Sequence, residues 1–224
     1  MSASRNAIAA TQYPGVFTDG ELLLTKNMVP HHRVYGERLY TQDDVEYREW
    51  VPSRSKLAAY MRKGGMKFPF REDSRVLYLG AASGTTSSHI ADIATAGTVY
   101  CVEISQRSFR DLVGVCERRT NMVPILADAT RPDDYAFAVE SPNVLYQDIA
   151  QKGQANIFVK NLKAFQIKVG LLVIKARSED VTREPVDIFR EVESQLRRAG
   201  CEVEEMVDLE PFEKDHAMAA VRVP

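Results

Sequence analysis

Residues 76–103 carry the pattern that most constrains the fold of this chain. A short apolar run, 76–79, ends in the small-residue loop 80–86 (GAASGTT), and a helical stretch then leads to a second apolar run that ends on Glu103. Strand, glycine loop, helix, strand and acid is the order in which an α/β fold binds an adenosine-containing ligand. The loop from Gly80 lets the backbone approach the ligand closely. Glu103, 23 residues after Gly80, is placed to accept both hydroxyls of a ribose.

The length and composition are those of an ordinary globular protein. The 224 residues suffice for one full domain and a small extra module, and the chain is 45% apolar and 27% charged. No apolar run approaches the roughly 20 residues of a membrane span, and the N-terminus lacks a signal-peptide core. The three cysteines, Cys101, Cys116 and Cys201, are widely spaced. We therefore expect a cytoplasmic protein with no membrane partner, no disulfide framework and no metal site.

Charge is distributed unevenly along the chain. Residues 1–71 carry 11 Lys or Arg and 7 Asp or Glu, residues 72–224 carry 18 and 24, and the net charge is −2. The stretch 53–71 contains basic residues and no acidic ones, namely Arg54, Lys56, Arg62, Lys63, Lys67 and Arg71. Such a run is either a solvated helix face or a patch that attracts phosphates.

The N-terminal part has the texture of short strands and tight turns. Residues 1–12 are small and polar without periodicity, and we expect them to be frayed. Asp19-Gly20 between the apolar runs 16–18 and 21–24 predicts a β-hairpin. We expect a second strand pair over 33–35 and 38–40, hinged at Gly36.

A helix is predicted to follow this module. Pro52 closes the module, Ser53 is the expected N-cap, and the helix should continue to about Arg62, where Gly64-Gly65 stops it. Residues 1–52 are too few to bury a good core alone. We therefore predict a small N-terminal β-rich domain that packs on a larger domain of residues 53–224.

Strands and helices alternate from Arg75 onward. We expect strands near 75–79, 98–103, 123–127, 143–147 and 169–175, and helices near 85–95, 106–118, 153–166 and 184–199. The run 169–174 is apolar throughout, as a central parallel strand should be.

The end of the chain breaks this alternation. Residues 201–207 and 216–223 are both strand-like, and no helix fits between them. Two consecutive strands at the end of a parallel sheet form an antiparallel hairpin. A dinucleotide dehydrogenase usually continues with further βα units, whereas an S-adenosylmethionine (AdoMet) methyltransferase usually closes its sheet with such a hairpin. We predict an α/β fold with a Rossmann-like seven-stranded methyltransferase sheet.

The glycine loop favours a ligand with a carboxylate. Its glycines are four residues apart, which differs from the G-x-G-x-x-G spacing that admits a pyrophosphate. Thr85 and Thr86 come at a helix N-terminus, where backbone N–H groups and hydroxyls favour an anion such as the methionine carboxylate of AdoMet. The alternative is a plain turn, and Glu103 has its own alternative as a helix-start acid beside Ser105.

Three further polar residues end predicted strands. Asp128 ends the third strand, where an acid can accept the exocyclic amine of an adenine, or simply cap a turn. Asp148 and Lys175 end the fourth and fifth strands, so both should lie at the carboxyl edge of the sheet, where ligands gather. The alternative for Lys175 is a strand-end lysine that reaches solvent.

Six passages stand in order along the chain: LYLGAASGTTSSHIADI, YCVEIS, ILADAT, YQDIAQ, LLVIKARS and EKDHAM. Together they resemble the fibrillarin family in its archaeal form, from about Tyr13 to the C-terminus. Fibrillarins are AdoMet-dependent RNA ribose 2′-O-methyltransferases of box C/D ribonucleoproteins. The resemblance therefore implies methylation of rRNA, with tRNA as a possible second substrate. The chain lacks the glycine- and arginine-rich extension of eukaryotic fibrillarins, so we expect an archaeal protein without nucleolar targeting.

The resemblance also implies residue roles and partners. AdoMet would contact Gly80, Ala81, Thr85, Thr86, Glu103, Ile104, Asp128, Ala129, Asp148, Ile149, Ala150 and Gln151. A catalytic set is implied on Lys56, Asp148, Lys175 and His216, without a metal. The implied partners are a Nop-domain scaffold protein, a kink-turn-binding protein and a box C/D guide RNA, which would select the rRNA or tRNA target by pairing.

Three other functions stay open at this point. A nicotinamide-dependent dehydrogenase is disfavoured by the glycine spacing and the terminal hairpin. A non-enzymatic scaffold would keep the fold without methyl transfer. A small-molecule methyltransferase is disfavoured by the basic stretch 53–71 and by the absence of a lid segment in the sequence.

Overall fold

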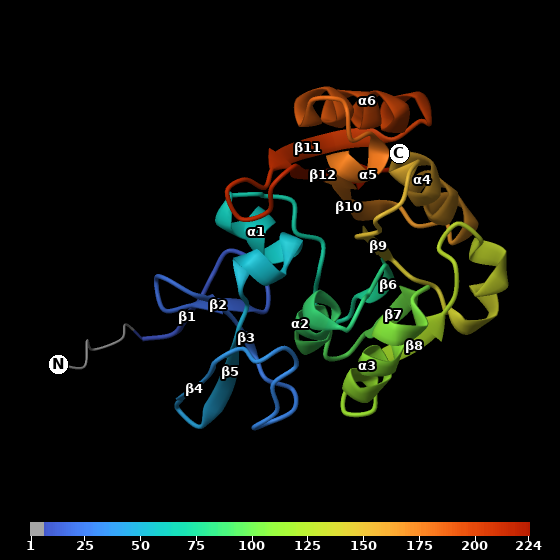
Figure 1. Ribbon diagram of the computed structural model, residues 1–224. Coiled ribbons are helices and arrows are strands. Elements are labelled where there is room, and N and C mark those ends of the chain that lie inside the picture. The colour runs from blue at the N-terminus through green and yellow to red at the C-terminus, as the bar shows by residue number, and fades with distance from the viewer. Residues whose placement is uncertain (1–6) are drawn as a thin grey trace.

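The computed structural model describes residues 7–224, and these residues form two β-sheets (Figure 1). An antiparallel sheet has the strand order β1-β2-β3-β5-β4, and a larger sheet has the order β11-β12-β10-β9-β6-β7-β8. The predicted fold class, a seven-stranded Rossmann-like sheet preceded by a small β-rich part, is confirmed. Within residues 7–224, no helix is long and apolar enough to cross a membrane.

The smaller sheet contains the first predicted hairpin. Its strands are β1 Ala9–Ala10, β2 Val16–Thr18, β3 Leu23–Lys26, β4 Leu39–Gln42 and β5 Val45–Glu49. Strand β2 pairs antiparallel with β3, so the predicted hairpin is present, although residues 19–22 connect the strands where Asp19-Gly20 alone was expected. Strand β1 pairs with β2, so the prediction that residues up to 12 are frayed is wrong for Ala9 and Ala10. Residues 1–6 of that prediction lie outside the described part of the chain.

The second predicted strand pair is wrong. Strand β4 pairs with β5 through Asp43 and Asp44, which both adopt positive φ (50° and 60°) and form the tight turn. Residues 33–35 form a loop instead, because the Glu37 carboxylate accepts hydrogen bonds from the N–H groups of Val34 and Tyr35. Hydrogen bonds to a buried carboxylate therefore take the place of the predicted strand pairing.

The helix before the larger sheet begins two residues later than predicted. Residues Pro52–Arg54 form a 3₁₀ turn, and helix α1 spans Lys56–Arg62. The N-cap is Ser55, whose hydroxyl accepts a hydrogen bond from the Ala58 N–H at 3.4 Å. The predicted cap, Ser53, lies inside the 3₁₀ turn that Pro52 begins, because proline suits the first position of such a turn.

The remaining elements follow the predicted alternation closely. The strands of the larger sheet are β6 Arg75–Leu79, β7 Thr98–Glu103, β8 Met122–Leu126, β9 Val144–Gln147, β10 Val169–Lys175, β11 Glu202–Asp208 and β12 His216–Arg222. The helices are α2 Thr85–Ile93, α3 Gln106–Cys116, α4 Gln154–Ala164, α5 Ala176–Glu179 and α6 Pro185–Arg198. Short 3₁₀ turns lie at Pro132–Asp134 and Ala136–Ala138. Strands β11 and β12 form the predicted antiparallel hairpin, and β12 also pairs antiparallel with β10.

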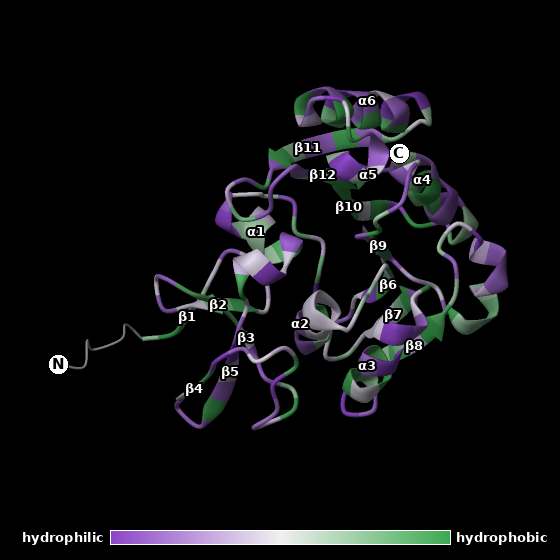
Figure 2. Cartoon of the chain, viewed as in Figure 1, coloured by the Kyte–Doolittle hydropathy of each residue, from purple (hydrophilic) through white to green (hydrophobic). Residues whose placement is uncertain are grey.

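The larger sheet has a hydrophobic core on each face. Successive strand residues point to opposite faces, so Tyr78 contributes to one core and Leu77 to the other. Helices α1, α2 and α3 cover the first face together with residues of the smaller sheet, such as Val16. Helices α4 and α6 cover the second face. Figure 2 shows both hydrophobic and hydrophilic residues along α6, which fits a surface helix with one buried side.

A buried ionic network joins the smaller sheet to helix α2. Arg48 on β5 donates to Glu37 at 2.7 Å and to Asp92 on α2 at 2.7 Å, and Arg119 contacts Asp92 at 3.3 Å. The side chains of all four residues are fully buried. The small sheet is thereby fixed to the helix that follows the glycine loop. The division into domains 1–52 and 53–224 stays a prediction.

Candidate active site

A cavity of about 290 Å³ lies at the carboxyl ends of the parallel strands. Ligands of open α/β sheets bind at this edge, next to the point where the strand order reverses. Here that point lies between β6 and β9, because β6 has β7 on its other side. The cavity is lined by Gly80, Ala82, Val102, Glu103, Ile104, Ser108, Ala127, Asp128, Ala129, Asp148, Ile149, Ala150, Gln151 and Lys175.

Position 80 requires a glycine because the ends of two strands approach each other closely there. Its φ of 81° lies in the left-handed region, and its N–H donates to the Val102 carbonyl at 2.9 Å. A Cβ added to Gly80 would stand 2.6 Å from the Asp148 carbonyl oxygen. Any larger residue would therefore push the first strand away from the fourth. The backbone can approach a ligand here because no side chain is in the way.

Glu103 closes the cavity at the end of β7. Glu103 is only 8% exposed. Its two carboxylate oxygens accept hydrogen bonds from the N–H groups of Ala82 at 2.8 Å and Ser105 at 2.7 Å. A carboxylate has about four lone-pair positions. Two of them are used by the backbone, so the others can accept hydroxyl groups. This arrangement suits the ribose ligand predicted from the sequence.

The next part of the lining combines an apolar surface with an acid. Ile104 is 64% exposed although it is a large apolar residue at the cavity. Asp128 accepts from the Thr130 N–H at 2.8 Å, which fixes the turn after β8. The Ala129 carbonyl is held by Asn161 of α4 at 2.9 Å. An exposed apolar side chain beside a carboxylate is what the face and the amine of an adenine require.

An ionic cluster lies at the other end of the cavity. The Lys175 ammonium is 2.7 Å from Asp148 Oδ1 and 3.2 Å from the Asp148 carbonyl oxygen. The Lys56 ammonium, from the first turn of α1, is 3.3 Å from Asp148 Oδ2. One carboxylate is thus shared by two ammonium groups whose side chains are 16–17% exposed. The two ammonium groups lie at the mouth of the site, where they can contact an anionic substrate.

His216 belongs to the same cluster through strand pairing. It stands directly opposite Lys175 in the antiparallel ladder of β10 and β12, and its Nδ1 is 2.5 Å from the Lys214 carbonyl oxygen. Burial, together with the charges of Lys56 and Lys175, lowers the pKa of His216 below its ordinary value, against the opposing effects of Lys214 and Glu213. The lowered pKa favours the neutral imidazole.

The four predicted catalytic residues are brought together by four elements. They come from α1, the end of β9, β10 and β12, which are far apart in the sequence. A fifth residue, Glu213, was missed: its carboxylate is 4.0 Å from the Lys56 ammonium. The acidic stretch around it gave no signal that would distinguish this residue from its solvated neighbours.

Three predicted cofactor contacts do not line the cavity. These are Ala81, Thr85 and Thr86. The Ala81 side chain lies in the hydrophobic core, and the buried Thr86 hydroxyl donates to Ser55 at 2.9 Å. Sequence reasoning also missed four lining residues, Ala82, Val102, Ser108 and Ala127, which have no side-chain chemistry that would distinguish them from ordinary strand, loop or helix residues.

The donor set fits AdoMet and gives no indication of a metal. An acid for the ribose, an apolar surface with an acid for the adenine, and a glycine cradle that a Cβ would fill follow one another along the cavity. Among residues 7–224, no group of three or more His, Cys, Asp and Glu lies close enough to hold a metal ion. A metal-independent reaction stays a prediction.

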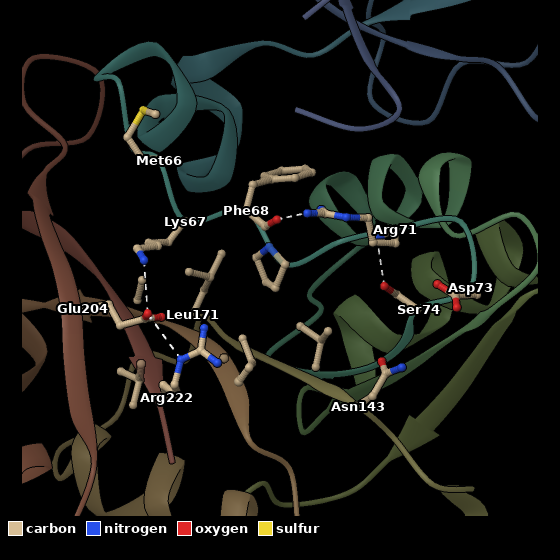
Figure 3. Close-up of a pocket in the computed structure, with 16 residues that line it drawn as sticks. Met66, Lys67, Phe68, Arg71, Asp73, Ser74, Asn143, Leu171, Glu204 and Arg222 are labelled. Carbon is tan, nitrogen blue, oxygen red and sulfur yellow. Dashed lines mark hydrogen bonds and ion pairs between the residues drawn. The ribbon is translucent and has the colours of Figure 1, made fainter. Parts of the chain in front are cut away.

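A larger cavity of about 480 Å³ lies at the opposite edge of the sheet (Figure 3). Four of its charged residues contact one another or the backbone: Glu204 pairs with Lys67 at 3.1 Å and with Arg222 at 3.3 Å, and Arg71 donates to the Phe68 carbonyl. The lining residues Asn143 and Gly170 lie at the amino ends of β9 and β10. Because ligands of such sheets bind at the other edge, we assign this cavity to packing of residues 66–71 on the sheet.

Comparison with known proteins decides the family. The family model described as Fibrillarin matches residues 8–224. This chain belongs to the fibrillarin family. The family and the methyltransferase class predicted from the sequence are thereby confirmed.

Relatives within the family resemble the chain over nearly its whole length. A Methanopyrus kandleri protein named fibrillarin-like rRNA/tRNA 2′-O-methyltransferase is 52% identical over 208 residues, which are 91% of this chain and 90% of the relative. The Aeropyrum pernix fibrillarin, solved with natively bound S-adenosyl-L-methionine, is 43% identical with a TM-score of 0.88, covering 96% of this chain and 97% of the other. The fibrillarin of a fibrillarin/Nop5p complex is 38% identical with a TM-score of 0.88, covering 96% and 100%.

Proposed function

We propose that this chain transfers a methyl group from AdoMet to the ribose 2′-oxygen of rRNA, and of tRNA as a second substrate, as the catalytic subunit of a guide-RNA-directed box C/D ribonucleoprotein. The observation that carries this proposal is the Lys175–Asp148 pair, with 2.7 Å between Nζ and Oδ1, at the end of a cavity built for an adenosine. Family membership favours AdoMet over a nicotinamide cofactor and RNA over a small molecule.

The donor would be held along the lining of the cavity. Glu103 would accept the ribose hydroxyls, Ile104 and Asp128 would contact the adenine, and Asp148 to Gln151 would border the methionine part. AdoMet supplies a sulfonium-bound methyl group, which is already strongly electrophilic. The protein must therefore chiefly align the acceptor oxygen and favour loss of its proton.

Lys175 is the group best placed to act on the acceptor. Its ammonium can donate a hydrogen bond to the 2′-oxygen and stabilise the negative charge that develops as the hydroxyl proton leaves. Asp148 orients this ammonium through its Oδ1, and its Oδ2 holds Lys56 at 3.3 Å. Lys56 and His216 belong to the same cluster and would hold the ribose and its neighbouring phosphate.

Target choice is assigned to partners. The Methanopyrus kandleri relative is named for rRNA and tRNA, and the solved complex pairs a fibrillarin with Nop5p. We propose that a Nop-domain scaffold, a kink-turn-binding protein and a guide RNA present the target to this chain in the cytoplasm of an archaeal cell. The purified chain alone should then leave a guided target unmethylated.

Reconstitution tests the proposal. The chain would be assembled with both protein partners, a guide RNA and a matching target, and 2′-O-methylation of the paired nucleotide would be measured. We expect Lys175→Ala to lower the rate at least about 10²-fold, in the range for loss of a positioned proton-transfer group, while AdoMet binding persists. Lys168, just before β10 at its opposite end, is the matched control, and Lys168→Ala should keep the normal rate. A near-normal rate for Lys175→Ala would reject the catalytic role of Lys175.

A further inference from the structure

The peptide of Lys175 lies where one neighbouring strand has already ended. The parallel ladder between β9 and β10 pairs residues 144–147 with 169–172, so it stops three residues before Lys175. On the other side, the Ala176 N–H donates to the Asp215 carbonyl at 3.0 Å. Because successive residues of a strand direct their N–H and C=O to opposite sides, those of Lys175 point toward the side that β9 has left. Buried groups there need other partners.

The side chain of Gln154 supplies both partners. Its carboxamide oxygen accepts from the Lys175 N–H at 2.8 Å, and its Nε2 donates to the Lys175 carbonyl at 3.1 Å. Gln154 is the first residue of α4 and is fully buried. A carboxamide presents one donor and one acceptor, as a peptide unit does. It therefore continues the edge of β9 by one residue.

Gln154 is itself held from two directions. Its N–H donates to Glu179 at 2.7 Å, and its carbonyl accepts from the Gln147 side chain at 2.9 Å. Gln147 is the last residue of β9 and directly precedes Asp148. The same group of contacts thus fixes the chain immediately before Asp148 and the peptide that carries the Lys175 side chain.

We propose that Gln154 is a positioning residue for methyl transfer, which replaces the missing strand beside Lys175 and thereby fixes the reach of its ammonium to Asp148. This inference rests on the proposed function, since it assigns Gln154 to the lysine that acts on the acceptor. The carboxamide contacts the Lys175 backbone, so its removal should leave the AdoMet cavity intact. Loss of the carboxamide should therefore lower the methylation rate at saturating AdoMet.

Two substitutions separate positioning from folding. Gln154→Leu keeps the approximate volume and removes both hydrogen bonds. We expect it to lower the methylation rate of the reconstituted particle about 10²-fold at saturating AdoMet, the scale of a misplacement of about 1 Å, with AdoMet affinity changed less than about threefold. Gln154→Glu has nearly the same shape, but its carboxylate can donate to the Lys175 carbonyl only when protonated. Its rate relative to the unaltered chain should therefore rise as the pH is lowered from about 8.5 to 6.5, since burial raises the pKa of such a carboxyl.

A matched control is available in Asn121. Like Gln154, Asn121 is a buried amide that contacts the backbone twice. Its side chain donates to the carbonyls of Ala91 and Ala94. It lies just before β8, away from the site. Asn121→Ala should lower the thermal midpoint while the rate of the folded particle stays normal. A normal rate for Gln154→Leu, or equal losses of rate in Gln154→Leu and Asn121→Ala, would overturn the positioning role. The proposed function would still stand if Lys175→Ala were inactive, whereas normal rates in both Gln154→Leu and Lys175→Ala would overturn both.

Discussion

Glu103 uses one carboxylate for two purposes. It fixes the glycine loop through the Ala82 N–H at 2.8 Å, and its remaining lone pairs face the cavity where we place the ribose. Glu103→Gln keeps the shape but turns an N–H₂ group toward one of the backbone donors or the ligand. A hydrogen bond to a charged group contributes about 1.5–3 kcal/mol, so AdoMet should bind about 10- to 100-fold more weakly by isothermal titration calorimetry.

The control for this measurement is an acid on the same βα unit. Glu117 is the exposed residue that follows α3, so Glu117→Gln should leave AdoMet affinity unchanged. Equal affinities for Glu103→Gln and the unaltered chain would remove Glu103 from the cofactor site. The rate of methyl transfer at saturating AdoMet should change less than the affinity, because Glu103 would contact the donor far from the acceptor.

The position of a single residue was predictable where a strand end could be recognised in the sequence. Glu103, Asp128, Asp148 and Lys175 each follow an apolar run, and parallel strands bring their carboxyl ends to one edge. Ser53 was predicted as a cap although Ser55 is the cap, because two serines near Pro52 both suit an N-terminus and only the 3₁₀ turn decides between them. Gln154 carried no signal, since its role depends on where a neighbouring strand stops.

At the scale of elements, helix α2 depends on a buried charge. Asp92 accepts from Arg48 at 2.7 Å and contacts Arg119 at 3.3 Å, and these side chains are fully buried. Removing one partner of a buried ionic group leaves an uncompensated charge, which costs about 3–5 kcal/mol. Asp92→Asn should therefore lower the free energy of unfolding by about that amount in urea titrations.

The comparison for this prediction is an exposed ion pair. Glu193 and Arg197 lie one turn apart on α6 with 2.8 Å between their charged atoms, and such pairs contribute little. Glu193→Gln should leave the unfolding midpoint nearly unchanged. If Asp92→Asn behaved like Glu193→Gln, the ionic network would not be what fixes the smaller sheet to α2.

Elements of the larger sheet were easier to predict than those of the smaller one. Strand β10 is apolar up to its last residue, and the alternating pattern of β11 has no helix before β12, so both follow from local sequence. The strand expected at 33–35 is a loop because Glu37 binds its backbone and Arg48 at once. That arrangement requires Arg48 from β5 and is invisible in a local pattern.

For the molecule as a whole, His89 couples stability to pH. Its ring is fully buried, stacks on Trp50, and contacts the hydroxyls of Thr25 and Tyr35 at 2.8 and 2.9 Å. Burial and the neighbouring charges of Arg48 and Arg119 lower the pKa of His89 well below its ordinary value. The folded protein therefore keeps His89 neutral, whereas the unfolded chain takes up a proton below about pH 6.5.

The sign of the pH dependence follows from proton uptake. Below about pH 6.5 the unfolded state binds one more proton at His89, so the stability present above that pH is lost as the pH falls, by about 1.4 kcal/mol at pH 5.5. In urea titrations from pH 7.5 to 5.5, His89→Gln should lose stability less steeply than the unaltered chain. If the free energy of unfolding of His89→Gln and of the unaltered chain fell equally steeply with pH, His89 would not be the source of this pH dependence.

The most direct measurement is a crystal structure of the chain soaked in AdoMet. The adenosine should lie between Glu103 and Asp128, with the transferable methyl group directed at the space bordered by Asp148 and Lys175. AdoMet bound elsewhere, or bound with its methyl group facing away from these two side chains, would contradict the proposed site of methyl transfer.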